Sequence, residues 1–169
     1  MGNLEIRQAL LVDSEMISKL HYKSWIRAYK EILPEQYFDQ ISLEKTNEHW
    51  FRILAEQGQE SVFLLAFNGD EFVGFINGGP SRDRESQGAE LYGLFVKNEN
   101  KGIGTFLLKN FVSDLRKINY ESFHAWVLNE SRAFGFFTKM GGVSTKFIQE
   151  ETGVPHVTFK ETMLSWKRI

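Results

Sequence analysis

The stretch that decides the fold runs from Glu90 to Leu108 and reads ELYGLFVKNENKGIGTFLL. Its first part, residues 89–97, is predicted to form a buried strand. A turn at residues 98–101 leads into a helix that is predicted from about Gly102 to Lys117. The two faces of the strand would carry Tyr92, Leu94 and Val96 on one side and Leu91 and Phe95 on the other.

The start of that helix can seat an anion of the phosphate type. The first N–H groups of a helix have no partner inside it, and the helix dipole adds positive charge at the same end. Gly102 and Gly104 let the backbone approach a ligand without a Cβ clash, and Lys97, Lys101 and Lys109 add positive charge. The spacing matches neither Gly-x-Gly-x-x-Gly nor a Walker P-loop. The motif alone is therefore compatible both with an anion-binding site and with an ordinary turn that binds no ligand.

A second segment, residues 125–142, repeats the order of strand, turn and helix and reads AWVLNESRAFGFFTKMGG. Together the two segments resemble the GNAT superfamily of acetyl-coenzyme A-dependent N-acetyltransferases. The first resembles its cofactor loop, and the second its Asn-x-x-Ala-x-x-Phe-Tyr-x-Lys-x-Gly pattern. Upstream, residues 24–34 (SWIRAYKEILP) are similar to the Ser-Trp…Tyr…Gly-Ile-x-Pro stretch of bacterial polyamine (spermidine/spermine) and phosphinothricin acetyltransferases.

The remaining elements agree with this resemblance. Strands are predicted at 4–9, 61–67, 72–77, 123–128, 143–148 and 156–166, with a hairpin turn at 68–71 and a polar loop at 78–88. Helices are predicted after a cap at Asp13 or Ser14, after Pro34, at about 43–57 and at 132–140. The resemblance implies an α/β (α+β) GNAT fold, in which a mixed, mostly antiparallel central sheet has helices on both faces. One parallel pair, near 89–97 and 121–128, would be splayed for acetyl-CoA, and residues 1–169 would form a single domain.

The resemblance also implies which residues hold the co-substrate, acetyl-CoA or coenzyme A, without a metal ion. The main chain of Leu94, Phe95 and Val96 would pair with the pantetheine arm as an added strand does. Asn129 would bond the pantetheine, and Lys139 would reach the far end of the cofactor. Backbone amides would hold the pyrophosphate at Lys101, Gly102, Ile103, Gly104 and Thr105.

For catalysis, Glu90 occupies the strand position where many family members keep a base. It would take a proton, directly or through water, from an amine whose free pKa is about 10. A backbone N–H near Leu94 or Phe95 would stabilise the oxyanion that forms during the attack. The attack would be direct, because the chain has no cysteine for an acyl-enzyme. The alternative is that Glu90 is an exposed residue on the surface of the strand without a role in catalysis.

The acceptor amine would meet aromatic residues. Trp25 and Tyr29, together with Tyr37, would form a wall that binds the amine by cation–π contact, although packing in the core explains the same residues equally well. Tyr92 is a further substrate-side residue and a candidate proton donor. Asp83 and Glu85 in the polar loop either attract a cationic substrate or are simply solvated.

Three departures from the family pattern affect these roles. The cofactor turn is about two residues shorter than usual, and Glu99 stands where Arg or Gln is expected, so we expect Glu99 to point away from the pyrophosphate and Lys101 to compensate. Asn129 lies one residue early, which leaves its role open between Asn129, Glu130 and Ser131. Phe137 replaces the Tyr that commonly protonates the departing thiolate, and phenylalanine has no proton to donate.

Composition excludes several other functions. With 20 basic and 22 acidic residues, the chain has no general field for nucleic acid or an anionic membrane. The absence of cysteine excludes disulfides and thiolate chemistry, and the four histidines lack metal-ligand spacing. No leader sequence or apolar run of about 20 residues is visible, so a cytoplasmic location is expected.

We therefore expect an N-acetyltransferase that moves an acetyl group from acetyl-CoA to a primary amine, on a small molecule such as a polyamine. A protein lysine or N-terminal acetyltransferase and a coenzyme A-binding module with weak catalysis stay open. A closed aromatic pocket would favour small amines, and an open groove would favour peptides. The sheet edge expected near 156–166 could pair across a homodimer.

Overall fold

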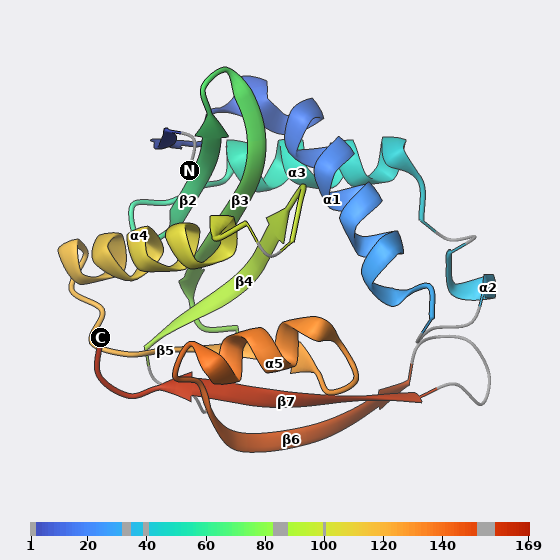
Figure 1. The fold of residues 1–169 in the computed structure, drawn as a ribbon, viewed down its shortest axis with the longest axis vertical. Coiled ribbons are helices and arrows are strands. Elements are labelled where there is room, and N and C mark those ends of the chain that lie inside the picture. Colours follow the sequence, from blue (N-terminus) through green and yellow to red (C-terminus); the bar gives the residue numbers. More distant parts are fainter. Residues whose placement is uncertain (1–2, 32–34, 39–40, 83–87, 100, 152–157) are drawn as a thin grey trace.

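A computed structural model describes residues 3–31, 35–38, 41–82, 88–99, 101–151 and 158–169. Within these residues a sheet of seven strands, in the order β1-β2-β3-β4-β5-β7-β6, lies between two layers of helices (Figure 1). Neighbouring strands are antiparallel except for β4 and β5, which are parallel. The elements are β1 (Leu4–Gln8), the 3-10 helix η1 (Leu11–Asp13), α1 (Ser14–Tyr29), α2 (Glu35–Phe38), α3 (Leu43–Ala55), β2 (Val62–Asn68), β3 (Glu71–Pro80), β4 (Ala89–Val96), α4 (Ile103–Lys117), β5 (Phe123–Leu128), α5 (Arg132–Lys139), β6 (Val143–Glu151) and β7 (Thr158–Trp166).

Strand β2 shows how the sheet separates two cores. Val62, Leu64 and Ala66 pack with α4 on one face, whereas Phe63 and Leu65 pack with α1 and α3 on the other. This alternation with buried side chains on both faces is typical of a central strand that is covered on both sides. Helices α1 and α3 thus cover one face of the sheet, and α4 and α5 cover the other.

The predicted hairpin of β2 and β3 is confirmed, and its turn has Gly69 at a positive φ of 60°. Strand β3, however, continues through Gly78 and Gly79 to Pro80, where the sequence suggested a polar loop. These glycines mark a close approach of two strands, because a Cβ on Gly78 would lie 2.4 Å from the carbonyl oxygen of Glu90. The prediction of a loop at residues 78–80 was therefore wrong.

Strand β4 contains an irregularity that the sequence did not reveal. Its register against β3 shifts between the pairs Asn77↔Gly93 and Gly78↔Leu91, so Tyr92 is an extra residue of a β-bulge. The alternation of side chains changes at this point. Leu94 and Val96 therefore pack in the same core as Leu91, whereas Phe95 packs in the other core, and the predicted division of faces was wrong.

The C-terminal hairpin corrects a second expectation. Strand β7 pairs with β5 on one side and with β6 on the other, so β6 and not β7 is the outer strand of this end of the sheet. A free strand edge near residues 156–166 was therefore the wrong basis for a homodimer.

Among the described helices, none is both long enough and apolar enough to cross a membrane.

Asp13, one of the two residues predicted to cap a helix here, stands at the N-cap position of α1. The carboxylate of Asp13 accepts two hydrogen bonds of 2.7 Å from Arg7 and one of 2.8 Å from the amide of Leu10. It makes no capping bond to α1, which begins at Ser14 directly after η1. The bond from Arg7 lowers the pKa of Asp13. Asp13 therefore fastens β1 to the start of α1.

Candidate active site

The parallel strands β4 and β5 separate soon after they meet. Their pairing consists of Ala89↔Phe123 and Glu90↔His124, and beyond these residues the strands diverge (Figure 1). On its other edge, β5 pairs with β7 along its whole length, from Phe123 to Leu128. The later part of β4 therefore borders a gap on the side that faces β5.

The backbone groups that border this gap follow from the ladder with β3. Lys97 donates its amide to the carbonyl of Val73 at 2.8 Å, and such bonded pairs alternate in an antiparallel ladder. Phe95 therefore directs its backbone groups to β3, whereas Leu94 and Val96 direct theirs to the gap. Of the two amides considered for the oxyanion, that of Leu94 has the suitable direction.

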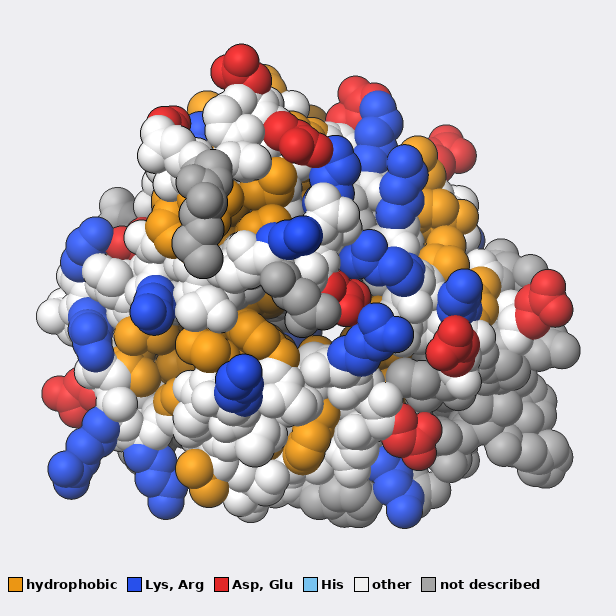
Figure 2. All heavy atoms as spheres, viewed as in Figure 1, with side chains coloured by type: hydrophobic (Ala, Val, Ile, Leu, Met, Phe, Trp, Pro, Cys, Tyr) orange, Lys and Arg blue, Asp and Glu red, His pale blue; other side chains and the backbone are white. Residues whose placement is uncertain are grey.

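The helix α4 begins beside the end of β4 with its first amides free. Gly102 precedes the helix in the left-handed region at φ 76°, and no side chain caps the helix. The first intrahelical bond is donated by Phe106 to Gly102 at 2.9 Å, so the amides of Ile103, Gly104 and Thr105 have no partner within the helix. Such an end attracts phosphate. Viewed as in Figure 1, the surface is hollowed between α4 and α5, and Lys and Arg side chains border the hollow (Figure 2).

Glu99 lies between two arginines at the mouth of the gap. Its carboxylate is 3.7 Å from Arg27 of α1 and 3.2 Å from Arg132 of α5. Arg27 also donates hydrogen bonds of 3.1 Å to the carbonyls of Val96 and Lys97. The loop after β4 is thus held between α1 and α5. Sequence reasoning did not find these arginines, because their contacts depend on how distant elements assemble.

Glu90 is buried, with 1% of its surface exposed. Its Oε1 accepts from the Nε of Arg82 at 2.9 Å and also from Nη2, and its Oε2 accepts from the backbone amide of Arg82 at 2.8 Å. The Nε2 of His124 is 3.9 Å from Oε2, on the last parallel pair before the gap. The alternative of a surface position for Glu90 is therefore wrong. Arg82, which the sequence did not identify, therefore supplies all three of the hydrogen bonds that described residues donate to the Glu90 carboxylate.

Tyr92, the candidate substrate residue outside the predicted aromatic wall, lies near Arg82 and Glu90. Its hydroxyl donates to the carbonyl of Pro80, and the guanidinium of Arg82 lies 4.8 Å from the centre of its ring. Burial and, next, the charge of Glu90 raise the pKa of Tyr92. Tyr92 therefore keeps its proton at neutral pH and directs it to Pro80.

The second family segment contributes α5 and the residues around it. Phe137 is 7% exposed and packs edge-on against Trp166 at 5.9 Å. The Oδ1 of Asn129 accepts a hydrogen bond of 2.7 Å from Thr162, which holds the amide in place, and Lys139 is exposed at the end of α5. Within the described residues, no three His, Cys, Asp or Glu side chains gather as metal ligands.

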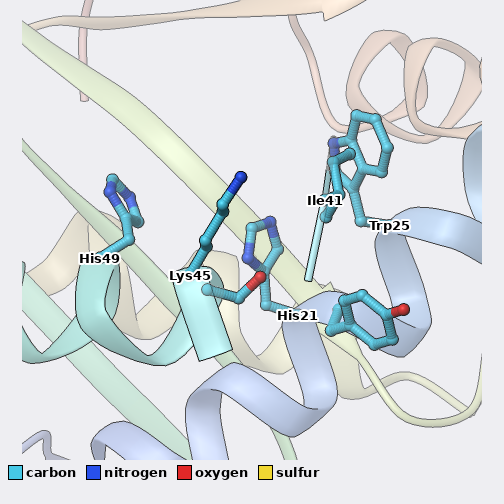
Figure 3. Close-up of a pocket in the computed structure, with 7 residues that line it drawn as sticks. His21, Trp25, Ile41, Lys45 and His49 are labelled. Carbon is cyan, nitrogen blue, oxygen red and sulfur yellow. The ribbon is translucent and has the colours of Figure 1, made fainter. Parts of the chain in front are cut away.

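A cavity of about 230 Å³ lies on the face of the sheet that α1 and α3 cover (Figure 3). Trp25 lines it, and Tyr29 packs edge-on against Trp25, with 5.0 Å between the ring centres, without being part of the lining. Tyr37, the third residue of the predicted wall, is not among the side chains that the structure describes. The described lining consists of His21, Tyr22, Trp25, Ile41, Lys45, Thr46 and His49.

His21 connects this cavity to β4. Its Nδ1 accepts a hydrogen bond of 2.9 Å from the indole of Trp50, and its ring meets the ring of Phe95 at 4.5 Å. Burial first, and then the charge of His49, lower the pKa of His21 to about 4, so His21 is neutral at pH 7. The sequence analysis gave His21 and His49 no role. His21 is four residues from Trp25, and His49 is four residues from Lys45. This spacing places each pair on one face of a helix, and it is the signal in the sequence that could have identified them as lining residues.

A splayed parallel pair beside an uncapped helix that follows a glycine is the arrangement that the resemblance to coenzyme A-dependent acetyltransferases implies. The model of the acetyltransferase (GNAT) family matches residues 22–142, so the chain belongs to this family and is an acetyltransferase.

Individual proteins agree with the family assignment. The chain is 25% identical over 164 residues to the uncharacterized N-acetyltransferase YuaI of Bacillus subtilis (strain 168), covering 95% of this chain and 91% of YuaI. Among solved structures, PaiA N-acetyltransferase from Thermoplasma acidophilum in complex with coenzyme A has a TM-score of 0.69 at 23% identity, covering 98% and 99% of the two chains. The yncA protein of Salmonella typhimurium, solved with acetyl-CoA, has a TM-score of 0.71 at 14% identity, covering 98% and 94%. These two structures share the fold with this chain.

Proposed function

We propose that this protein transfers an acetyl group from acetyl-CoA to a primary amine of a small molecule by direct attack. The observation that carries this proposal is the separation of β4 and β5 beyond Glu90 and His124, next to the free N-terminal amides of α4. The gap suits an extended arm that bonds along a strand edge, and the helix end suits a diphosphate. Acetyl-CoA combines these two parts and supplies an activated acetyl thioester.

In this proposal the chain divides the binding of acetyl-CoA between two elements. The amides of Ile103, Gly104 and Thr105 bind the pyrophosphate, with Gly102 leaving the approach open, since among the described residues no atom lies within 4 Å of a Cβ built on it. Lys101 is exposed on the same loop and adds positive charge. The backbone of β4 binds the pantetheine, Asn129 supports it from the end of β5, and Lys139 serves the far end of the cofactor.

The reaction needs a base and a stabiliser of negative charge. The new C–N bond replaces the C–S bond, the electron pair of the broken bond goes to sulfur, and the amine proton goes to Glu90 or to an intervening water. The amide of Leu94 stabilises the negative charge that develops on the thioester oxygen. Phe137 supplies no proton to the leaving sulfur, and the hydroxyl of Tyr92 bonds Pro80, so solvent protonates the thiolate.

The acceptor side of this proposal is the open hollow of about 230 Å³ beside α1 and α3, where Trp25 supplies an aromatic face for an amine. A polyamine is the first class of acceptor to test. The described lining carries Lys45, His21 and His49 but no carboxylate. This favours, as a second candidate, an acceptor with one amine and a neutral or anionic remainder.

An assay with isotope-labelled acetyl-CoA tests the proposal directly. The panel contains polyamines, small monoamines, amino acids and a lysine peptide, and mass spectrometry identifies each acetylated product. We expect acetyl transfer to at least one small primary amine. Transfer to the peptide alone would favour a protein acetyltransferase. Coenzyme A binding without transfer to any amine would reduce the protein to a binding module.

A further inference from the structure

Lys45 of α3 carries a charge that the packing of the chain does not use. It lines the hollow beside α1 and α3, and its side chain is exposed there. The backbone amide of Lys45 donates to the hydroxyl of Ser42 at 3.1 Å. Its ammonium group, however, makes no ion pair or hydrogen bond with any residue that the structure describes. Contacts within the fold therefore give no reason for this charge.

The position of Lys45 along α3 is also unfavourable for a lysine. Ser42 caps the helix, so Lys45 is the third helical residue and lies in the first turn. The helix dipole is positive at this end and favours acidic side chains. After a serine cap, a Glu or Gln at the third position can also return a hydrogen bond to the amide of the cap, whereas lysine has no acceptor. Lys45 therefore does not serve the stability of the helix.

The surroundings of Lys45 in the hollow are cationic and aromatic rather than acidic. His49 follows one turn later on the same face of α3, and burial and then the charge of Arg52 lower its pKa. Glu44 and Glu48, the nearest glutamates in the sequence, are exposed and do not belong to the described lining. An anion would therefore meet positive charge and no carboxylate among the described lining residues, and a second ammonium group would meet like charge.

The hollow extends from Lys45 to the part of α1 that lies against β4. In the view of Figure 3, the ring of His21 stands between Lys45 and Trp25. Ser24, the neighbour of Trp25, donates to the carbonyl of Val96 at 3.5 Å, at the part of β4 that borders the gap. An acceptor whose amine lies at Trp25 therefore has its far end toward Lys45.

We propose that Lys45 binds a carboxylate of the acceptor, so that the second substrate is an amino acid with its amine at Trp25. This rests on the proposed function and names the class of acceptor. One ammonium group matches a single negative charge, and the apolar surface of Ile41 suits the carbon chain between the two ends. The same contact selects against polyamines, because it would place their second ammonium group beside Lys45.

A matched panel of acceptors tests this role. It contains ω-amino acids of increasing length, together with the monoamines and the diamines of equal length. Lys45→Gln removes the charge and supplies a side chain that suits the serine cap, and Lys45→Glu reverses the charge. Lys23→Gln is the matched control, because Lys23 is an exposed lysine of α1 that does not line this hollow. Each protein is measured for its thermal midpoint, its Kd for coenzyme A, and kcat/KM for each amine.

We expect the wild type to acetylate the amino acids most efficiently and the diamines least. Lys45→Gln should lower kcat/KM for the best amino acid by about threefold or more, and should change that of the matched monoamine by less than about twofold. Lys45→Glu should make the matched diamine a better substrate than the amino acid. Both variants should keep the Kd for coenzyme A, with a thermal midpoint equal to or above that of the wild type. Lys23→Gln should keep the wild-type order of substrates.

The outcomes separate two failures. If the wild type acetylates the monoamines or diamines as efficiently as the amino acids, Lys45 does not select a carboxylate, and the proposed acetyl transfer stands. An equal loss for all three kinds of amine in Lys45→Gln overturns the role in the same way, because the effect then does not depend on the charge of the acceptor. If the wild type acetylates no amine at all, the proposed function fails, and the role of Lys45 fails with it.

Discussion

Acidification should destabilise this protein through His21, which is partly buried and neutral in the folded state. Its pKa is about 4 when folded and about 6.5 when unfolded, because burial and then the charge of His49 oppose protonation. Between these values the unfolded chain binds more protons, so stability falls as the pH decreases from 6.5 toward 4. From pH 7 to pH 5 the two values give a loss of roughly 2 kcal/mol in the free energy of unfolding. For a chain of this length that is about 4–8 °C in thermal midpoint.

The variant His21→Asn isolates this effect. Asparagine does not titrate, and its Oδ1 can replace the Nδ1 of His21 as the acceptor for Trp50, which donates at 2.9 Å in the wild type. Urea unfolding of both proteins at pH 7 and pH 5 gives the comparison. We expect the variant to lose about 2 kcal/mol less than the wild type over this range. His49, whose pKa burial also lowers, leaves a residual slope of the same sign. Equal losses in both proteins would refute the reasoning.

Three further predictions concern charge, catalysis and packing. Glu99→Gln should tighten coenzyme A binding by roughly two- to fivefold at low salt, with a smaller gain at high salt, because it removes a carboxylate from Arg27 and Arg132 beside the diphosphate site. Titration calorimetry measures this, and weaker binding would contradict it. Glu90→Gln should lower kcat by roughly 10²–10⁴-fold with coenzyme A affinity unchanged, whereas a loss below about tenfold would remove Glu90 as the base. Trp50→Ala should cost about 3–5 kcal/mol by chemical unfolding, since Trp50 is 5% exposed among aromatic rings, and a loss below about 1 kcal/mol would contradict the packing argument.

The elements that the sequence predicted well are those whose signal is local. The turn around Gly69, the helix from Ile103 to Lys117 and the strand from Phe123 to Leu128 each follow from periodicity and glycine within one short stretch. The family resemblance added the parallel pair of β4 and β5, which periodicity alone does not indicate. Local patterns and the family resemblance together predicted that the space between β4 and β5 lies next to the start of α4.

What the sequence did not predict depends on contacts between distant segments. The bulge at Tyr92 inverts the faces of β4, and alternation in the sequence gives no sign of it. The sequence assigned no role to Arg82 or Arg27, yet Arg82 binds the carboxylate of Glu90 and Arg27 lies beside that of Glu99. Gly78 reads as part of a loop, although the carbonyl of Glu90 approaches it so closely that only glycine fits. The order of β7 and β6 likewise depends on how the last hairpin docks, which no single stretch encodes.

The most direct test of the account is calorimetric titration of coenzyme A into the wild type and Gly104→Val. In the variant a Cβ would lie 3.3 Å from the ring of Phe136, beside the free amides of α4. Gly58→Val is the control, because no atom lies within 4 Å of a Cβ built on Gly58. The account predicts binding to the wild type and the control, and binding weakened by about tenfold or more in Gly104→Val. No heat of binding in the wild type, or equal affinity in Gly104→Val, would contradict the claim that the start of α4 holds the diphosphate.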